Sequence, residues 1–294
     1  RYLKTDRTKK EGDKMEEIIL QRKLEALGQN GTLIRKDGKT FLQLDCENAK
    51  ELSMKWGEKL YPFTKTGKKW ILELPFSTPV NYVQICVDGQ EVLSPELPIA
   101  HGYGRPYNYI ELPDEDGLFE LRDVPHGTLT QEFYKSKISD NWEKLIVYLP
   151  PCVPSAGLPV LYLQHGFGES EISWSTTGKV NFLMDNLIAA GKIKPFAIVM
   201  GNGMVKQRID GELKLNRALY GQMLVEEILP MIEKKYQFGG SKEKRGMAGL
   251  SMGSVQTTRT ICAHPELFSE VGIFSGFLRD RIVGDEEHDG IVPK

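Results

Sequence analysis

The stretch that decides the fold is Ala248-Gly249-Leu250-Ser251-Met252-Gly253. Residues 244–250 can run as a buried strand, and residues 254–263 predict a helix that ends near Pro265. A strand, a sharp turn and a helix are the context of a nucleophile elbow, in which a strained turn exposes the serine hydroxyl at the top of a sheet. Glycine suits positions 249 and 253 because side chains there would collide as the helix folds back on the strand. The alternative interpretation is a turn of small residues with no chemical role.

A second motif lies upstream of this turn. Residues 158–164 form a continuous apolar run, which is typical of a strand buried on both faces of a parallel sheet, and His165-Gly166-Phe167-Gly168 follows it. Acyl transfer places negative charge on the substrate carbonyl oxygen, and preorganised N–H groups stabilise that charge. The backbone N–H groups of Phe167 and Met252 are the expected donors. An ordinary strand-to-loop turn with a structural histidine remains the alternative.

Composition and charge exclude several classes of function. The chain has 294 residues, with 40% hydrophobic and 27% charged residues, as in a soluble globular protein of one or two domains. A net charge of −2 favours neither nucleic acid nor an acidic membrane surface. No apolar run reaches the length of a membrane span, and no secretory signal is visible. The compartment, bacterial cytoplasm or secretion, and the oligomeric state stay open.

Metal and nucleotide motifs give no support for a cofactor. The four cysteines are scattered and form no Cys-x-x-Cys pair, so we expect no metal site. Neither a phosphate-binding loop nor a Gly-x-Gly-x-x-Gly run occurs, so we expect no nucleotide and no other cofactor.

Pattern changes along the chain divide it into four parts. Residues 1–28 are highly charged and read as a solvated arm, with helical spacing of apolar residues over 15–27. Short alternating strands over 29–97 predict a small β-sandwich. Prolines and glycines punctuate 98–117, which reads as a linker. Residues 118–294 alternate strands and helices, which predicts a mostly parallel sheet with helices on both faces, an α/β fold.

Individual elements can be placed within these parts. In the sandwich, strands are expected over residues 40–44, 70–74, 82–87 and 91–93. In the α/β part, strands are expected over 142–149, 160–164, 196–200 and 271–275, and helices over 182–190 and 219–236. Three aromatic residues of the sandwich, Trp56, Tyr61 and Trp70, could either stack on sugar rings or belong to its core or rim.

Several blocks in fixed order resemble the putative esterase family. They are Asp123-Val124-Pro125-His126-Gly127, Val147-Tyr148-Leu149-Pro150-Pro151, residues 159–166, Asp185-Asn186-Leu187-Ile188 and residues 249–253, and the match covers about residues 118–277. That family includes feruloyl esterases, enterochelin esterases, S-formylglutathione hydrolases and mycolyltransferases. The chain is most similar to bacterial feruloyl and acetyl-xylan esterases with an N-terminal immunoglobulin-like domain.

The resemblance implies an α/β-hydrolase fold with Ser251 as nucleophile and an oxyanion hole at Phe167 and Met252. It also suggests substrate contacts at four residues, for which packing roles are equally open: His165, Gly166, Trp174 and Asn202.

The partners of the nucleophile are not identified in this sequence. In the α/β-hydrolase order, an acidic residue and then a histidine follow the serine, each after a further strand, and few residues follow Ser251 here. His101, His126 and His165 precede the serine, His264 ends its helix, and His288 lies in a charged run typical of a solvated loop. We therefore expect a C-terminally incomplete hydrolase domain with little or no activity alone.

The expected function is hydrolysis of carboxylic esters through an acyl-enzyme on Ser251. The expected substrates are small-molecule or polysaccharide esters, with hydroxycinnamoyl or acetyl groups released from plant cell-wall polysaccharide. The alternatives are a siderophore esterase or acyltransferase, and a carbohydrate-binding protein that has lost its base.

Overall fold

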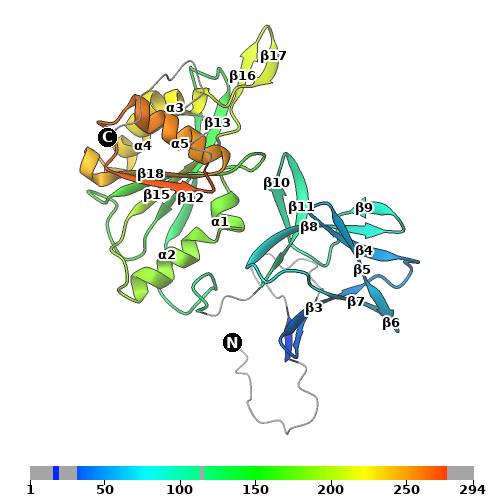
Figure 1. The fold of residues 1–294 in the computed structure, drawn as a ribbon. Helices are drawn as coiled ribbons and strands as arrows, with labels where there is room; N and C mark the ends of the chain where they lie inside the picture. Colours follow the sequence, from blue (N-terminus) through cyan, green and yellow to red (C-terminus); the bar gives the residue numbers. More distant parts are fainter. Residues whose placement is uncertain (1–15, 20–31, 113–115, 277–294) are drawn as a thin grey trace. The chain divides into compact units, whose positions relative to one another are not determined.

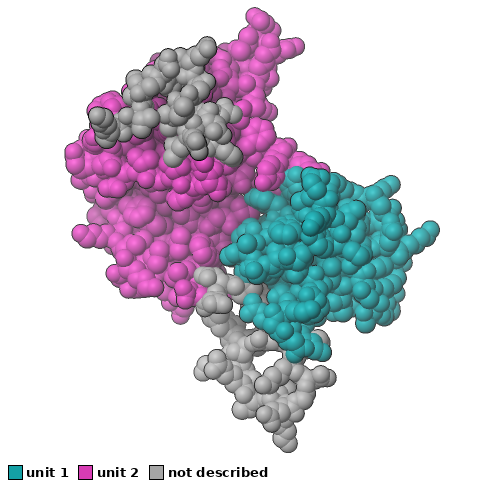
Figure 2. Space-filling view, in the orientation of Figure 1, with its two compact units in different colours: residues 1–99, 106–113 teal, residues 100–105, 114–294 magenta. Residues whose placement is uncertain are grey.

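A computed structural model describes residues 16–19, 32–112 and 116–276 of the chain (Figure 1). The chain divides into two compact units, one formed by residues 1–99 and 106–113 and the other by residues 100–105 and 114–294 (Figure 2).

The first unit is a sandwich of two antiparallel sheets. One sheet has the order β1-β2-β3-β7-β6, and the other has the order β10-β11-β8-β4-β5 with β9 beside β8. Both contribute to one core, with Leu42 and Leu72 from the first sheet and Met54 and Ile85 from the second. The strands of these two sheets are β1 (Glu16–Ile19), β2 (Thr32–Lys36), β3 (Lys39–Asp45), β4 (Leu52–Trp56), β5 (Lys59–Pro62), β6 (Thr64–Thr66), β7 (Lys69–Glu73), β8 (Val80–Val87), β9 (Gln90–Val92), β10 (Ile99–Gly102) and β11 (Arg105–Glu111). Residues 100–105, which include most of β10 and the turn to β11, are counted with the second unit.

The predicted linker is wrong over much of its length, because residues 98–117 contain β10 and β11. β11 pairs with β8 in an antiparallel ladder that starts at Asn108. The proline that suggested a linker, Pro106, lies before the first of these pairs, where a missing N–H removes no hydrogen bond to β8.

The predicted helix over residues 15–27 is also wrong where the structure describes it. β1 pairs with β2 in an antiparallel register, Ile18 opposite Leu33. The β-branched pair Ile18-Ile19 suits a strand on a sheet edge better than a helix. The rest of the charged arm lies outside the described residues.

The three aromatic residues of the sandwich, Trp56, Tyr61 and Trp70, belong to its core or pack against it. Trp70 is buried, and its indole N–H donates to the carbonyl of Cys46 over 2.8 Å. The Trp56 ring packs on Phe76 with centroids 5.0 Å apart, and Tyr61 is half-buried against the same core. None of the three is an exposed sugar platform.

The second unit confirms the α/β prediction. Its six-stranded sheet has the order β12-β13-β15-β14-β18-β19. β15, β14, β18 and β19 run parallel, and β13 pairs antiparallel with both of its neighbours, β12 and β15. The strands are β12 (Thr128–Lys135), β13 (Trp142–Leu149), β14 (Val160–Gln164), β15 (Ala197–Gly201), β18 (Arg245–Leu250) and β19 (Glu270–Phe274), and a separate hairpin is formed by β16 (Lys206–Ile209) and β17 (Glu212–Leu215).

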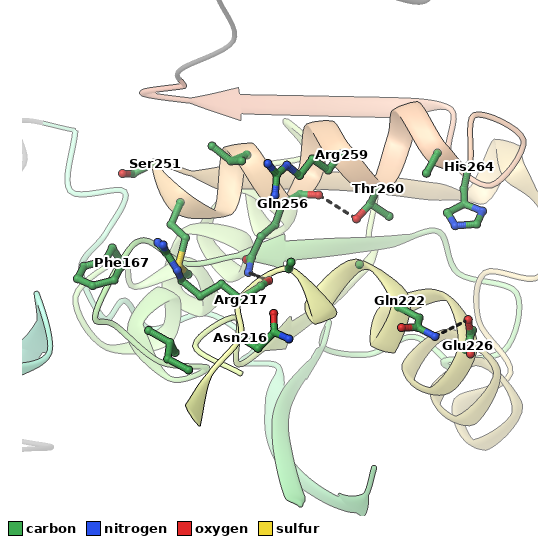
Figure 3. A pocket seen from close by; sticks show the side chains of 16 residues that line it. Phe167, Asn216, Arg217, Gln222, Glu226, Ser251, Gln256, Arg259, Thr260 and His264 are labelled. Carbon is green, nitrogen blue, oxygen red and sulfur yellow. Dashed lines mark hydrogen bonds between the residues drawn. The ribbon is translucent and has the colours of Figure 1, made fainter. Parts of the chain in front are cut away.

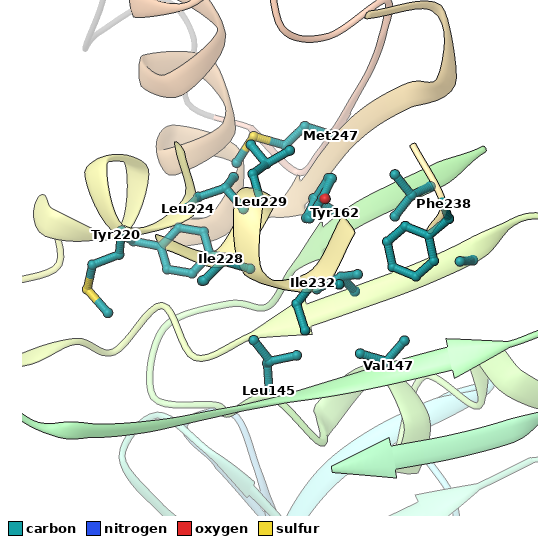
Figure 4. Close-up of a cluster of buried hydrophobic side chains, with 14 of the residues drawn as sticks. Leu145, Val147, Tyr162, Tyr220, Leu224, Ile228, Leu229, Ile232, Phe238 and Met247 are labelled. Atoms are coloured by element: carbon teal, nitrogen blue, oxygen red, sulfur yellow. The ribbon is translucent and has the colours of Figure 1, made fainter. Parts of the chain in front are cut away.

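Helices cover both faces of this sheet. One face holds Ile146 and Leu163 against α1 and α2; the opposite face holds Leu145 and Val147 against the helices that follow β17 (Figure 4). The helices are α1 (Ser173–Thr176), α2 (Val180–Ala189), α3 (Leu219–Met223), the π-helical η1 (Leu224–Ile228), α4 (Leu229–Tyr236), the 3₁₀ turn η2 (Lys242–Lys244) and α5 (Met252–Ala263).

The helix predicted over 219–236 is continuous but changes pitch. It runs as α3, η1 and α4, with Leu224, Ile228 and Ile232 buried on the sheet side. Pro230 opens α4 and has no N–H to donate to the carbonyl four residues before it. The wider π-helical turn lies just before this missing bond, where such a bulge is expected.

We expect Leu145→Ala to lower the free energy of unfolding of the second unit by about 2–5 kcal/mol, because Leu145 is fully buried and the change leaves a cavity. Leu213→Ala, at an exposed position of β17, is the control and should change it by less than about 0.5 kcal/mol. Urea unfolding followed by intrinsic fluorescence measures both. Equal effects of the two changes would contradict the assigned core.

Candidate active site

Ser251 occupies a strained turn between β18 and α5. Its backbone has φ 51° and ψ −111°, a conformation that is costly for a residue with a side chain. The turn is held on both sides: the N–H of Ser251 donates to the carbonyl of Phe274 over 2.9 Å, and the carbonyl of Ser251 accepts from the N–H of Ser254 over 2.9 Å. The predicted strand, turn and helix are therefore present, with the side chain half-buried at the carboxyl edge of the sheet.

Two glycines allow the first turn of α5 to approach neighbouring strands closely. A Cβ on Gly249 would lie 2.2 Å from the carbonyl oxygen of Gly253. A Cβ on Gly253 would lie 2.6 Å from the carbonyl oxygens of both Gln164 and His165, at the end of β14. The predicted clash is thus real, and for Gly253 it is with β14 rather than with the strand of the serine itself.

The loop after β14 is fixed by backbone contacts within the second unit. The N–H groups of Tyr103 and Gly104 donate to the carbonyls of Phe167 and Gly168 over 3.3 and 3.2 Å. Gly168 has φ +75°, and a Cβ there would lie 2.0 Å from the nitrogen of Gly104. Glycine is required at 168 on both counts.

His165 is a buried structural residue, not an exposed substrate contact. Its side chain is 1% exposed, its Nε2 accepts from the N–H of Gly203 over 2.9 Å, and its Nδ1 lies 2.8 Å from the carbonyl oxygen of Gly166. Nδ1 therefore carries the hydrogen and Nε2 the lone pair. Burial lowers the pKa of His165 below its usual value, so the imidazole is neutral.

Asn202 also holds a loop. Its Oδ1 accepts from the N–H of Met204 over 2.9 Å, and its Nδ2 donates to Glu171 over 3.1 Å. Glu171 is 1% exposed and pairs with Lys144 over 2.7 Å. The amide of Asn202 is thus bonded to protein groups on both sides.

The other two predicted contacts are Gly166 and Trp174. The N–H of Gly166 donates to a carboxylate oxygen of Glu169 over 2.8 Å. The half-buried ring of Trp174 packs 6.1 Å from that of Phe274, at the end of β19, and its indole N–H is buried without an acceptor among the described residues.

A groove of about 950 Å³ brings three of the predicted residues together: Phe167, Ser251 and Met252. It runs between α5 and the segment 215–226, and Figure 3 shows Ser251 and Phe167 at one end of it. Met252 is the first residue of α5, so its N–H has no acceptor within the helix. Phe167 is 43% exposed on the groove.

Two residues that the sequence did not indicate shape this end of the groove. The guanidinium of Arg217 lies 5.2 Å from the centroid of the Phe167 ring. The amide of Gln256 donates to the carbonyls of Gly203 and Arg217 over 2.9 and 3.0 Å. Gln256 could have been suspected as a polar residue on the helix after the serine, but no sequence pattern pointed to Arg217.

Two of the described histidines, His264 and His126, lie far from Ser251. His264 caps the far end of α5, about 18 Å away along twelve residues of helix. His126 pairs with Asp185 over 2.9 Å. The next residue, Gly127, lies against Leu149 at the end of β13, so His126 is at the amino edge of the sheet, whereas Ser251 is at the carboxyl edge. His288 lies outside the described residues.

The described part of the chain contains no group of three or more His, Cys, Asp or Glu residues placed to hold a metal ion. None of its helices has both the length and the hydropathy of a membrane-spanning segment.

Comparisons with known proteins agree on the type of protein. The model of the family described as "Putative esterase" matches residues 136–287. An endo-1,4-beta-xylanase/feruloyl esterase of Xylanibacter ruminicola is 31% identical over 264 residues, which are 85% of this chain and 36% of that relative. The match thus spans about a third of the relative's length.

Solved structures share the fold. A ferulic acid esterase from Anaeromyces mucronatus superposes with a TM-score of 0.51 at 22% identity, over 55% of this chain and 63% of that one. The enterobactin esterase of Shigella flexneri superposes with a TM-score of 0.60 at 12% identity, over 88% of this chain and 76% of that one.

Gly249→Ala should destabilise the second unit by about 1–3 kcal/mol or more, because the new methyl group meets backbone atoms that cannot rotate away. Gly246→Ala is the matched control on the same strand, since its Cβ would have only ordinary contacts at 3.4 Å. Urea unfolding of both variants provides the measurement. A Gly249→Ala protein as stable as Gly246→Ala would show that the turn is looser than described.

His165 should make stability depend on pH. Its folded pKa lies below the usual value of 6.5, so the unfolded chain binds its proton first as the pH falls. Its contribution is therefore complete above pH 6.5 and is lost progressively below it. His165→Asn should be less stable at pH 8 and lose less stability between pH 8 and pH 5, measured by urea unfolding across about this range. The same loss in both proteins would contradict the buried neutral imidazole.

Proposed function

Because the chain belongs to the putative esterase family, we propose that it carries the nucleophile of a serine carboxylic-ester hydrolase acting on hydroxycinnamoyl esters of plant cell-wall polysaccharide. The observation that carries the proposal is Ser251 in its strained turn, in one groove with Phe167 and Met252.

The proposed chemistry starts at Ser251. Its Oγ attacks the ester carbonyl, a tetrahedral intermediate forms, and the alcohol leaves to give an acyl-enzyme that water hydrolyses. The N–H groups of Met252 and Phe167 receive the negative oxygen of the intermediate. For Met252, support comes from its place at the first position of α5, where the partial positive charge of the helix end also favours an anion.

The surrounding hydrogen bonds are proposed to hold these two N–H donors in place. The N–H of Tyr103 donates to the carbonyl of Phe167, in the peptide that follows the proposed donor, and His165 ties the same loop to Gly203. Preorganised donors cost no rearrangement when the charge forms, which is why rigid loops support catalysis here. The histidine and acid that activate Ser251 are not assigned to described residues.

The substrate class is supported by the relative from Xylanibacter ruminicola, whose name joins xylanase and feruloyl esterase. An acetyl ester of the same polysaccharide is the nearest variant of this proposal. A siderophore ester is the second candidate substrate, because the family that the sequence blocks resemble includes enterochelin esterases. The likeness to the solved enterobactin esterase concerns the fold alone.

In a form of the protein that hydrolyses methyl ferulate, Ser251→Ala should reduce kcat/KM by at least about a thousandfold, because no other group replaces the attacking oxygen. Ser269→Ala, at an exposed serine before β19, is the control and should leave the rate unchanged. Release of ferulate is followed by absorbance. Equal rates in the Ser251→Ala and unmodified proteins would contradict the nucleophile.

The substrate is tested separately on the unmodified protein by comparing methyl ferulate, an acetylated xylan and enterobactin. Faster release of ferulate supports the proposal. Hydrolysis of enterobactin alone, still lost on Ser251→Ala, would contradict the substrate and retain the nucleophile.

A further inference from the structure

An exposed aromatic pair lies on the antiparallel edge of the hydrolase sheet. Trp142, the first residue of β13, is 68% exposed, and Phe133 on the edge strand β12 is 62% exposed. Large aromatic side chains this exposed are unusual, because each leaves much apolar surface in water.

The register of β12 and β13 places these two side chains on one face. Lys135 lies opposite Trp142, and Phe133 lies opposite Lys144. Phe133 and Trp142 are therefore diagonal neighbours about 7 Å apart, near enough to form one surface. Leu129, 44% exposed, continues the same face along β12.

The two lysines beside the aromatic residues are already paired. Lys135 Nζ donates to the carbonyl and carboxylate of Asp140 over 2.7 and 2.9 Å. Lys144 Nζ pairs with the buried Glu171 over 2.7 Å. Because both ammonium groups are neutralised by protein carboxylates, the surface offers apolar ring faces rather than a net positive charge.

The position of the surface relates it to Ser251. β13 runs antiparallel to β15, with Leu145 opposite Gly201, so Trp142 lies beyond the carboxyl end of β15. Ser251 follows the carboxyl end of β18, which is three strands from β13 in the sheet. At the usual strand spacing the two positions are about 14 Å apart along the same edge.

We infer that Trp142 and Phe133 form a binding site for the neutral polysaccharide backbone, a β-1,4-linked xylan, beside the ester-cleaving groove. Sugar rings present C–H faces that pack on exposed aromatic rings, and a neutral chain matches a surface whose lysines are paired. A polymer held on this surface can extend along the sheet edge toward Ser251. The choice of xylan rests on the proposed function; the surface itself does not.

The test measures binding of unesterified xylan, so that it is independent of hydrolysis. Xylohexaose is titrated calorimetrically into the protein, into a Trp142→Ala/Phe133→Ala variant, and into an Ile209→Ala/Leu213→Ala control, which removes exposed apolar side chains of the β16–β17 hairpin. We expect about tenfold weaker binding in the aromatic variant alone, with the same unfolding midpoint and no dependence of affinity on salt.

A second readout separates this site from the groove. The aromatic variant should hydrolyse methyl ferulate at the unmodified rate, and should show a raised KM on feruloylated arabinoxylan. Equal xylohexaose affinity in the aromatic variant and the unmodified protein would overturn the inference. It would also be overturned if light scattering showed that the aromatic pair holds a dimer together while xylan binding is unchanged.

Discussion

The close approach of the first turn of α5 to the end of β14 is the contact on which the candidate site depends. Gly253 faces the carbonyls of Gln164 and His165 with no room for a Cβ, and Gly249 faces Gly253 in the same way. This crossing fixes the start of α5, and with it Met252, beside the loop that contains Phe167. It also forces the connecting residue, Ser251, into a backbone conformation that its neighbours must hold in place.

Hydrogen bonds connect this helix crossing to the loops after β14 and β15. Gly203 donates to His165, and its carbonyl accepts from Gln256 of α5, so that the loops after β14 and β15 are tied to each other and to the helix. The amide of Gln256 also holds the backbone of Arg217. Burial keeps His165 neutral, and only the neutral imidazole can accept the hydrogen bond from Gly203 that holds these loops together.

Sequence reasoning succeeded where a feature depends on neighbouring residues. The apolar runs predicted β13 and β14 with the bounds that the structure gives, and the glycine spacing predicted the turn at Ser251, because close packing excludes side chains locally. Sequence reasoning failed where a residue's partners are distant in the sequence. The hydrogen bond between Gln256 and Arg217 joins residues 39 positions apart. The burial of His165 depends on the loop after β15, so the sequence alone suggested a substrate contact there. The strands β10 and β11 were missed since prolines suggested a linker and their partner strand decides otherwise.

The aromatic residues show why residue type alone cannot assign a sugar-binding surface. Trp70 alternates inward on β7 and donates its indole N–H to a backbone carbonyl, so it is part of the sandwich core. Trp142 is the first residue of β13 and lies on the same face of the sheet as Ile146 and Tyr148. Helix α2 covers that face at Ile146 and Tyr148 but does not reach Trp142, which is exposed. An apolar side chain on the inward face of a strand thus stays exposed when the strand extends beyond its covering helix. The carboxyl edge of the sheet, where loops replace helices, is therefore where aromatic side chains near Ser251 remain accessible to a polymeric substrate.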